Sequence, residues 1–217
     1  DWSAGYSYAN RNMPDRRRYN TVLNTYTNQL EVENLNEINR EFSRLNEHIL
    51  SANINYQHDF AFGDFTPTLK MGGYTEYRTR EYNTRLFIYS WKNGLPSNYR
   101  VMNVPDELMQ DKNYGEDKLY LLEQVDWRNN YEGNNMLGAG YAGVNLPFGK
   151  WNIYAGVRFE HSRMELISNT QKNEKSPTSV YYTYDDFFPS LNAAYRLNEQ
   201  HQFGLSYGRT VNRPEFR

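Results

Sequence analysis

Apolar and polar residues alternate with a period of two near the carboxyl-terminal end of the chain. Between residues 191 and 197, and again between 203 and 207, the apolar residues occupy the odd positions. This period is typical of a β-strand with one apolar face, and the polar segment 198–200 between the two runs is short enough for a hairpin. The even positions carry Gly, Ser, Asn and Arg, with one Ala at 194, and this mostly polar set suits a wet surface. The pattern predicts an antiparallel pair with one shared apolar face, made of Leu191, Ala193, Tyr195, Phe203, Leu205 and Tyr207.

The same alternation recurs earlier in the chain. It is clearest at residues 50–60, and other examples lie at 1–9, 69–77, 137–141 and 151–159. We expect the strand at 69–77 to continue towards Trp91, and the strand at 1–9 to pair with a segment elsewhere in the chain. Together these stretches predict about seven strands.

Short and long connections alternate between the predicted strands. The short ones are residues 62–65, 147–150 and 198–201, and the long ones are 10–46, 91–132 and 167–184. Inside the first long connection, apolar residues recur at steps of three and four, which indicates an amphipathic helix. We favour extended structure from about Glu47, and the pattern leaves open whether 35–49 is helix or strand. The residues at helical spacing are Leu35, Ile38, Phe42, Leu45 and Ile49.

Two architectures fit one-sided strands of this kind. In a soluble β-sandwich the apolar face packs on a second sheet, and the many Tyr and Trp side chains would suit a carbohydrate-binding module. In an outer-membrane barrel the apolar face contacts lipid, with short turns on one rim and long loops on the other. The strict alternation of short and long connections favours the barrel.

One segment carries a specific resemblance. The stretch FPSLNAAYRLNEQHQFGLSYGRTVNRPEF resembles the late barrel hairpin of TonB-dependent outer-membrane receptors, in which an FPS-led strand, a short turn and a strand ending in NRP occur together. Several other stretches resemble barrel strands and loop ends of the same family: HILSANINYQHDF, LKMGGYTEYRTREYNTR, NNYEGN and WNIYAGVRFEHSRMEL.

The resemblance implies a transporter of the outer membrane that takes up a scarce nutrient. Barrels of that family have 22 strands around a plug domain, so residues 1–217 would form part of the barrel. The implied partners are outer-membrane lipid, the remaining strands and plug of the same barrel, TonB through a segment that precedes the barrel, and a transported ligand that the resemblance does not identify.

The amino-acid composition agrees with a barrel and excludes some kinds of chemistry. Aromatic residues make up 16% of the chain, with 20 Tyr, although the hydrophobic fraction is only 38% and the mean hydropathy is −0.93. Alternating strands with aromatic girdles have this composition. The net charge of −2 gives no reason to expect a nucleic-acid partner, and the lack of cysteine excludes disulfides and thiol chemistry. No apolar run is long enough for a transmembrane helix.

No enzyme or cofactor is expected from the sequence. The four His residues lack metal-ligand spacing, and Asp185 and Asp186, as neighbours on a strand, point to opposite faces, which favours a polar strand end over a catalytic pair. Three arginines, Arg78, Arg80 and Arg85, are candidates to line a lumen or hold an anionic ligand, although pairing with Glu or Asp on neighbouring strands is the commoner role. The membrane-facing candidates are the six residues of the carboxyl-terminal pair together with Ile54, Tyr56, Ile153 and Val157.

Overall fold

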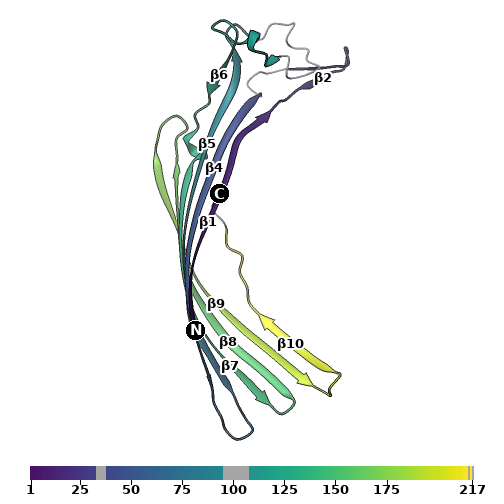
Figure 1. Ribbon diagram of the computed structural model, residues 1–217, viewed down its shortest axis with the longest axis vertical. Coiled ribbons are helices and arrows are strands. Elements are labelled where there is room, and N and C mark those ends of the chain that lie inside the picture. Colours follow the sequence, from purple (N-terminus) through teal and green to yellow (C-terminus); the bar gives the residue numbers. More distant parts are fainter. Residues whose placement is uncertain (33–37, 95–107, 215, 217) are drawn as a thin grey trace.

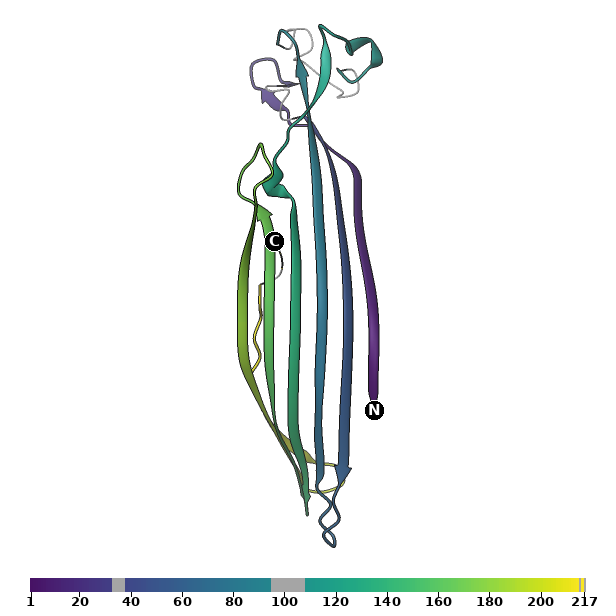
Figure 2. The same ribbon diagram turned by 90° about the vertical axis from the view of Figure 1, so that its left-hand side faces the viewer.

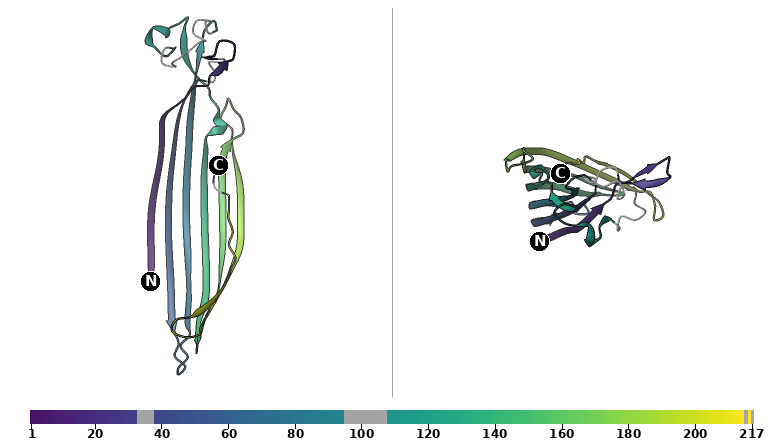
Figure 3. Two further views of the ribbon diagram at one scale, coloured as in Figure 1. Left: turned by 90° about the vertical axis from the view of Figure 1, so that its right-hand side faces the viewer. Right: turned by 90° about the horizontal axis from the view of Figure 1, so that it is seen from above.

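The protein is described by a computed structural model that covers residues 1–32, 38–94, 108–214 and 216. One tall antiparallel sheet curves into a trough, and a small head built from the long connections lies at one end of it (Figure 1). The strands run side by side along the length of the molecule (Figure 2), and the view from above shows the curvature of the single layer (Figure 3). The all-β fold expected from the alternation is confirmed.

The main sheet is a meander in which each long strand pairs with the next long strand in the sequence. The order is β1-β4-β5-β7-β8-β9-β10. The bounds are β1 (Trp2–Arg18), β4 (Asn39–Asp59), β5 (Thr68–Trp91), β7 (Tyr131–Phe148), β8 (Trp151–Asn169), β9 (Pro177–Arg196) and β10 (Gln202–Gly208). Smaller elements complete the head and the rim: β2 (Val22–Asn24) pairs with β3 (Gln29–Glu31), β6 (Leu119–Glu123) pairs with β5, and η3 (Asp111–Asn113) and η4 (Trp127–Asn129) are single 3₁₀ turns.

All three short turns lie at the same end of the sheet, opposite the head (Figure 1). The tightest joins β7 to β8 through two residues, and Gly149 there has φ +57°, a left-handed conformation that glycine adopts without steric cost. Gly63, in the β4–β5 turn, has φ +64° for the same reason. The predicted asymmetry, with short turns at one end and long connections at the other, is confirmed.

The strands reach further than the hydrophobic alternation predicted. The connection expected over residues 10–46 is shorter than predicted, because β1 continues to Arg18 and β4 begins at Asn39. Likewise β8 and β9 leave only residues 170–176 between them, where a connection over 167–184 was expected. The register shows why: Asn10 lies opposite Asn46 on one face and Arg16 opposite Glu41 on the other, so these segments pair through the backbone while polar side chains occupy both faces. Such segments pair as strands without producing a period of two.

The ambiguous stretch 35–49 is strand from Asn39 onward, so extension begins well before the expected start at Glu47. Residues 33–37 lie outside the described part. The helical spacing came from side chains with different partners: Ile38 is buried in the head, whereas the Phe42 ring contacts Phe87 of β5 edge-on at 5.6 Å. Phe42 and Leu45 are three residues apart within β4 and therefore lie on opposite faces of the sheet.

The only extended apolar core among the described residues lies in the head, not in the sheet. Segments from both sides of the first two long connections meet there, with Tyr19, Trp91 and Met109 packed around it. The sheet itself is a single layer with no second sheet against it, so its apolar side chains are not covered by protein. The buried core residues are Val32, Ile38, Tyr89, Leu108 and Leu119.

Candidate lumen and lipid faces of the sheet

The tail that follows β10 identifies the two faces of the sheet. Residues after Gly208 leave the ladder and run along the concave side (Figure 1). Arg213 in this tail contacts Glu160 of β8 and Asp186 of β9, so these two carboxylates lie on the concave face. Because side chains alternate along each strand, the register extends this assignment to the whole sheet.

All ten candidates for membrane contact fall on the convex face by this register. The face is well exposed, with Leu205 at 72%, Ile54 at 64% and Val157 at 46% relative accessibility. Large apolar side chains with no protein cover are expected only where something other than water contacts them. The ten residues are Leu191, Ala193, Tyr195, Phe203, Leu205, Tyr207, Ile153, Val157, Ile54 and Tyr56.

The exposed apolar side chains of the convex face form a band across the strands. This apolar band is oblique to the hydrogen-bonded rows of the sheet. On β5 the band ends at Tyr77, whereas on β8 it ends at Phe159. The register places Phe159 level with Gly140, and Gly140 level with Gly73. The end of the apolar band on β8 is therefore level with Gly73 of β5. On β5 itself the band continues to Tyr77, four residues further from the short turns. Strands tilted against a barrel axis produce such an oblique band.

Aromatic rings mark both borders of this band. Near the short turns Trp151 packs on Tyr195 with ring centroids 4.8 Å apart, and at the opposite border Phe159 packs on Phe187 at 4.9 Å. The next convex residues beyond Phe159 and Phe187 are His161 and Asp185, which contact each other at 2.8 Å. The convex face thus changes from apolar to aromatic to polar along the strand, the sequence expected across a membrane interface.

The concave face is polar, and several of its charges form ion pairs. Arg80 of β5 forms an ion pair with Glu47 of β4, and both side chains are largely buried. Arg78 binds Glu76 at 3.0 Å, and the Tyr74 hydroxyl donates to the same carboxylate at 2.6 Å. These four charged side chains are therefore held in place by neighbours across and along the strands.

The three candidate arginines do not form one site. Arg78 and Arg80 share the concave face, whereas Arg85 has the opposite parity and lies on the convex side, near the rim. There it forms a two-point contact with Glu123 of β6 at 2.7 and 2.9 Å. Arg85 also lines a cavity of about 420 Å³ beside Trp127. A shared anion site for all three is excluded by this geometry, and each arginine pairs with a glutamate.

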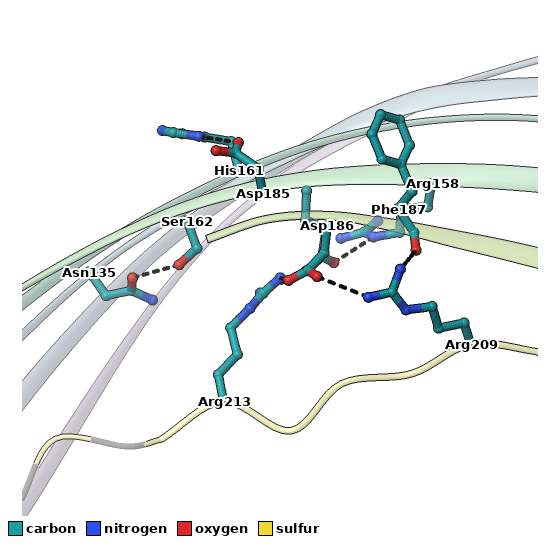
Figure 4. A network of polar contacts seen from close by, with 10 residues as sticks. Asn135, Arg158, His161, Ser162, Asp185, Asp186, Phe187, Arg209 and Arg213 are labelled. Atoms are coloured by element: carbon teal, nitrogen blue, oxygen red, sulfur yellow. Dashed lines mark hydrogen bonds and ion pairs between the residues drawn. The ribbon is translucent and has the colours of Figure 1, made fainter. Parts of the chain in front are cut away.

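A charged network on the concave face joins the tail to the sheet (Figure 4). Arg213 contacts Glu160 at 2.9 Å and Asp186 at 3.0 Å, and Glu160 also accepts from Arg158 at 2.7 Å. Arg209 approaches Asp186 at 3.4 Å. Two carboxylates and three guanidinium groups thus form one network, with a net charge of +1, where the tail crosses β8 and β9.

The neighbouring aspartates belong to different faces, as the alternation predicted. Figure 4 shows Asp185 beside His161 on one side of the sheet and Asp186 facing Arg213 on the other. They lie in the middle of β9 and not at a strand end, because β9 begins at Pro177. Sequence reasoning did not single out Arg213, although it lies inside the NRP segment that carried the family resemblance. Its role depends on a contact across 27 residues, which no local pattern records.

Among the groups with shifted pKa values are Asp126 at the rim and Tyr114 in the head. The Arg128 side chain donates to Asp126, and this lowers the pKa of that carboxyl below its ordinary value. Burial, followed by a hydrogen bond with Tyr89, raises the pKa of the Tyr114 hydroxyl to about 12. Both shifts favour the charge state that each group ordinarily has at neutral pH.

The accessible surface also distinguishes a membrane wall from a soluble domain. The chain exposes 15152 Å², while a compact soluble protein of 25.8 kDa would expose about 10,500 Å². The excess comes from a single-layered sheet with an uncovered apolar convex face and a polar concave face. A sheet of this kind is typical of the wall of a transmembrane β-barrel.

Comparison with known families agrees with this class. A family model described as "Outer membrane protein beta-barrel family" matches residues 1–217, and the chain belongs to that family. The protein is therefore a β-barrel protein of the outer membrane, and lipid is its environment. A comparison with curated proteins gave no match. Among the described residues, no helix has the length and apolar character needed to cross a bilayer.

Proposed function

We propose that this chain is a section of the barrel wall of a TonB-dependent transporter that imports a scarce nutrient. The observation that carries the proposal is the segment from the FPS of β9 to the NRP of the tail, which resembles the late hairpin of such receptors. The role proposed is transport, without enzymatic chemistry.

The open sheet supports a barrel completed by further strands. Within the described residues, β1 pairs only with β4, and β10 pairs only with β9, so both edges of the sheet are free. In hydrocarbon each unpaired backbone group costs several kcal/mol. Seven strands also cannot enclose a lumen as wide as that of a plugged transporter, since diameter grows with strand number. We therefore propose that residues 1–217 are part of a larger barrel.

The polar concave face supports a plugged lumen. Ion pairs such as Arg80 with Glu47 reduce the unpaired charge that a plug domain would bury when it contacts this wall. The partners proposed are this plug, TonB acting through a segment before the barrel, and a ligand of undetermined chemistry. A soluble carbohydrate-binding sandwich is not favoured, because the sheet has no second layer and the chain belongs to an outer-membrane family.

Solute flux into liposomes tests the proposal. The 217-residue chain and the full-length protein are reconstituted separately, and uptake is compared in the same lipid. We expect no specific, saturable uptake by the chain alone. In cells, uptake by the full-length protein should stop when TonB is deleted. Saturable flux through the isolated chain would contradict the claim that other strands complete the barrel, and uptake that survives TonB deletion would contradict the transport mechanism.

A further inference from the structure

β10 stops where its neighbour can no longer donate a hydrogen bond. The Arg209 amide donates to the Pro189 carbonyl at 3.3 Å, continuing the register that pairs Gly208 with Ser190. A pair in this position normally exchanges two bonds, but proline has no N–H to return the second. From here the tail turns away from β9 and crosses the concave face (Figure 1).

Arg213 anchors this tail to the wall at a first point. Its guanidinium binds two carboxylates from different strands, Glu160 of β8 and Asp186 of β9, and all three side chains are only 16–17% exposed. The guanidinium also lies over the rings of Tyr184 and Phe188, at 5.7 and 6.0 Å. A charge-paired and partly buried arginine with this many contacts is a fixed attachment.

Phe216 provides a second attachment further up the wall. Its side chain is only 5% exposed and lies directly over Gly133 of β7. A Cβ at Gly133 would come within 2.6 Å of the Phe216 ring, so any larger residue there would displace it. Arg80 completes the seat, with its guanidinium 5.7 Å from the ring centroid and a hydrogen bond to the Phe216 carbonyl at 3.4 Å.

The wall uses the same construction for its own aromatic residues. The Tyr154 ring lies over Gly143 and Gly156, where an added Cβ would approach its hydroxyl to 2.6 and 2.8 Å. Glycines on the concave face therefore act as seats for rings that lie flat against the sheet. Gly133 differs because its ring comes from the tail, a segment distant from it in the sequence.

We propose that residues 209–214 together with Phe216 form a lumen strap, fixed to the barrel wall by Arg213 and Phe216, that narrows the passage beside the wall. The proposal rests on the function proposed above, since the concave face must be the lumen. The strap leaves the plane of the sheet at Pro189 and lies on the side through which solute passes. Its two attachments use different interactions, an ion-pair cluster and a ring seat, so each can be removed separately.

The test uses the full-length protein with a nitroxide spin label on a cysteine at Val211, which is 46% exposed and so has room for the label. Gly133→Val should expel Phe216, and Arg213→Gln should remove the ion pairs. Both should shift the label from slow to fast motion and raise the uptake of a hydrophilic dye into liposomes. The matched control is Gly138→Val on the same strand, where an added Cβ meets nothing within 4 Å. This control should change neither readout.

The outcomes separate the strap from the transport proposal. Slow label motion in both variants would show that the tail is not held as described, and faster motion without added uptake would show that it does not narrow the passage. Either result overturns the strap. Label motion needs no transport, so failure of TonB-dependent uptake in cells would count against the proposed function alone. Unchanged migration of the unheated variants on gels identifies those that still fold.

Discussion

The amide of Arg209 donates to the carbonyl of Pro189, and no bond returns in the opposite direction because proline lacks an N–H. The substitution Pro189→Ala supplies the missing donor. We expect the new amide at position 189 to bond to the Arg209 carbonyl, and its hydrogen exchange to be slow in the assembled barrel. The gain of about 1 kcal/mol from the bond is offset by the greater freedom of the unfolded chain without proline, so stability should change little. Fast exchange at this new amide would show that the strand diverges for another reason.

In β10, the destabilisation caused by an introduced charge should depend strongly on which face of the sheet carries it. Leu205→Arg should destabilise the barrel by about 2–4 kcal/mol if that position lies near the bilayer midplane, because the charge would face lipid. Ser206→Arg on the concave face should cost much less. Denaturant titration of the full-length protein folded into vesicles measures both. An unchanged midpoint for Leu205→Arg would remove that residue from the lipid face.

The paired arginines predict unequal effects of substitution. Arg80→Ala leaves Glu47 buried without its cation, which should cost about 3 kcal/mol of unfolding free energy. Arg85→Ala breaks a pair in which the Arg85 side chain is 64% exposed, so solvent screening should make its cost clearly smaller. Unfolding of both variants in the same vesicles compares them directly. Equal costs would show that the Arg80 pair is as solvated as the rim pair.

The sequence predicts those features of the fold and the site that depend on residues close together in the chain. It does not predict those that depend on contacts between distant segments. The lipid-facing parity of residues such as Leu205 was predictable, because alternation along one strand records which side is apolar. The upper halves of β1 and β4 were not, since residues there are polar on both faces and pair through the backbone. The split between Arg80 and Arg85 follows from parity alone and was available from the sequence. The Arg213 cluster was not, because it brings together residues from three distant segments.

Topology predicts which cysteines an impermeant reagent can reach on whole cells. A cysteine at Asn20 or Asn173, in connections at the head end, should be labelled without lysis, since long loops of bacterial barrels face outward. A cysteine at Asp64, in a short turn, should be labelled only after lysis. The chain has no native cysteine, so the background is clean. The reverse pattern would invert the orientation.

The most direct test of the membrane-wall assignment is a nitroxide scan of β10, residues 203–208, in the full-length protein reconstituted in lipid. All six positions are exposed, and added atoms at Gly204 and Gly208 meet nothing within 4 Å, so a label fits throughout. Labels at odd positions should collide with oxygen, which concentrates in lipid, and labels at even positions should collide with a water-soluble nickel complex. Loss of the alternation, or oxygen contact at the even positions, would contradict the assignment of the convex face to lipid and the concave face to the lumen.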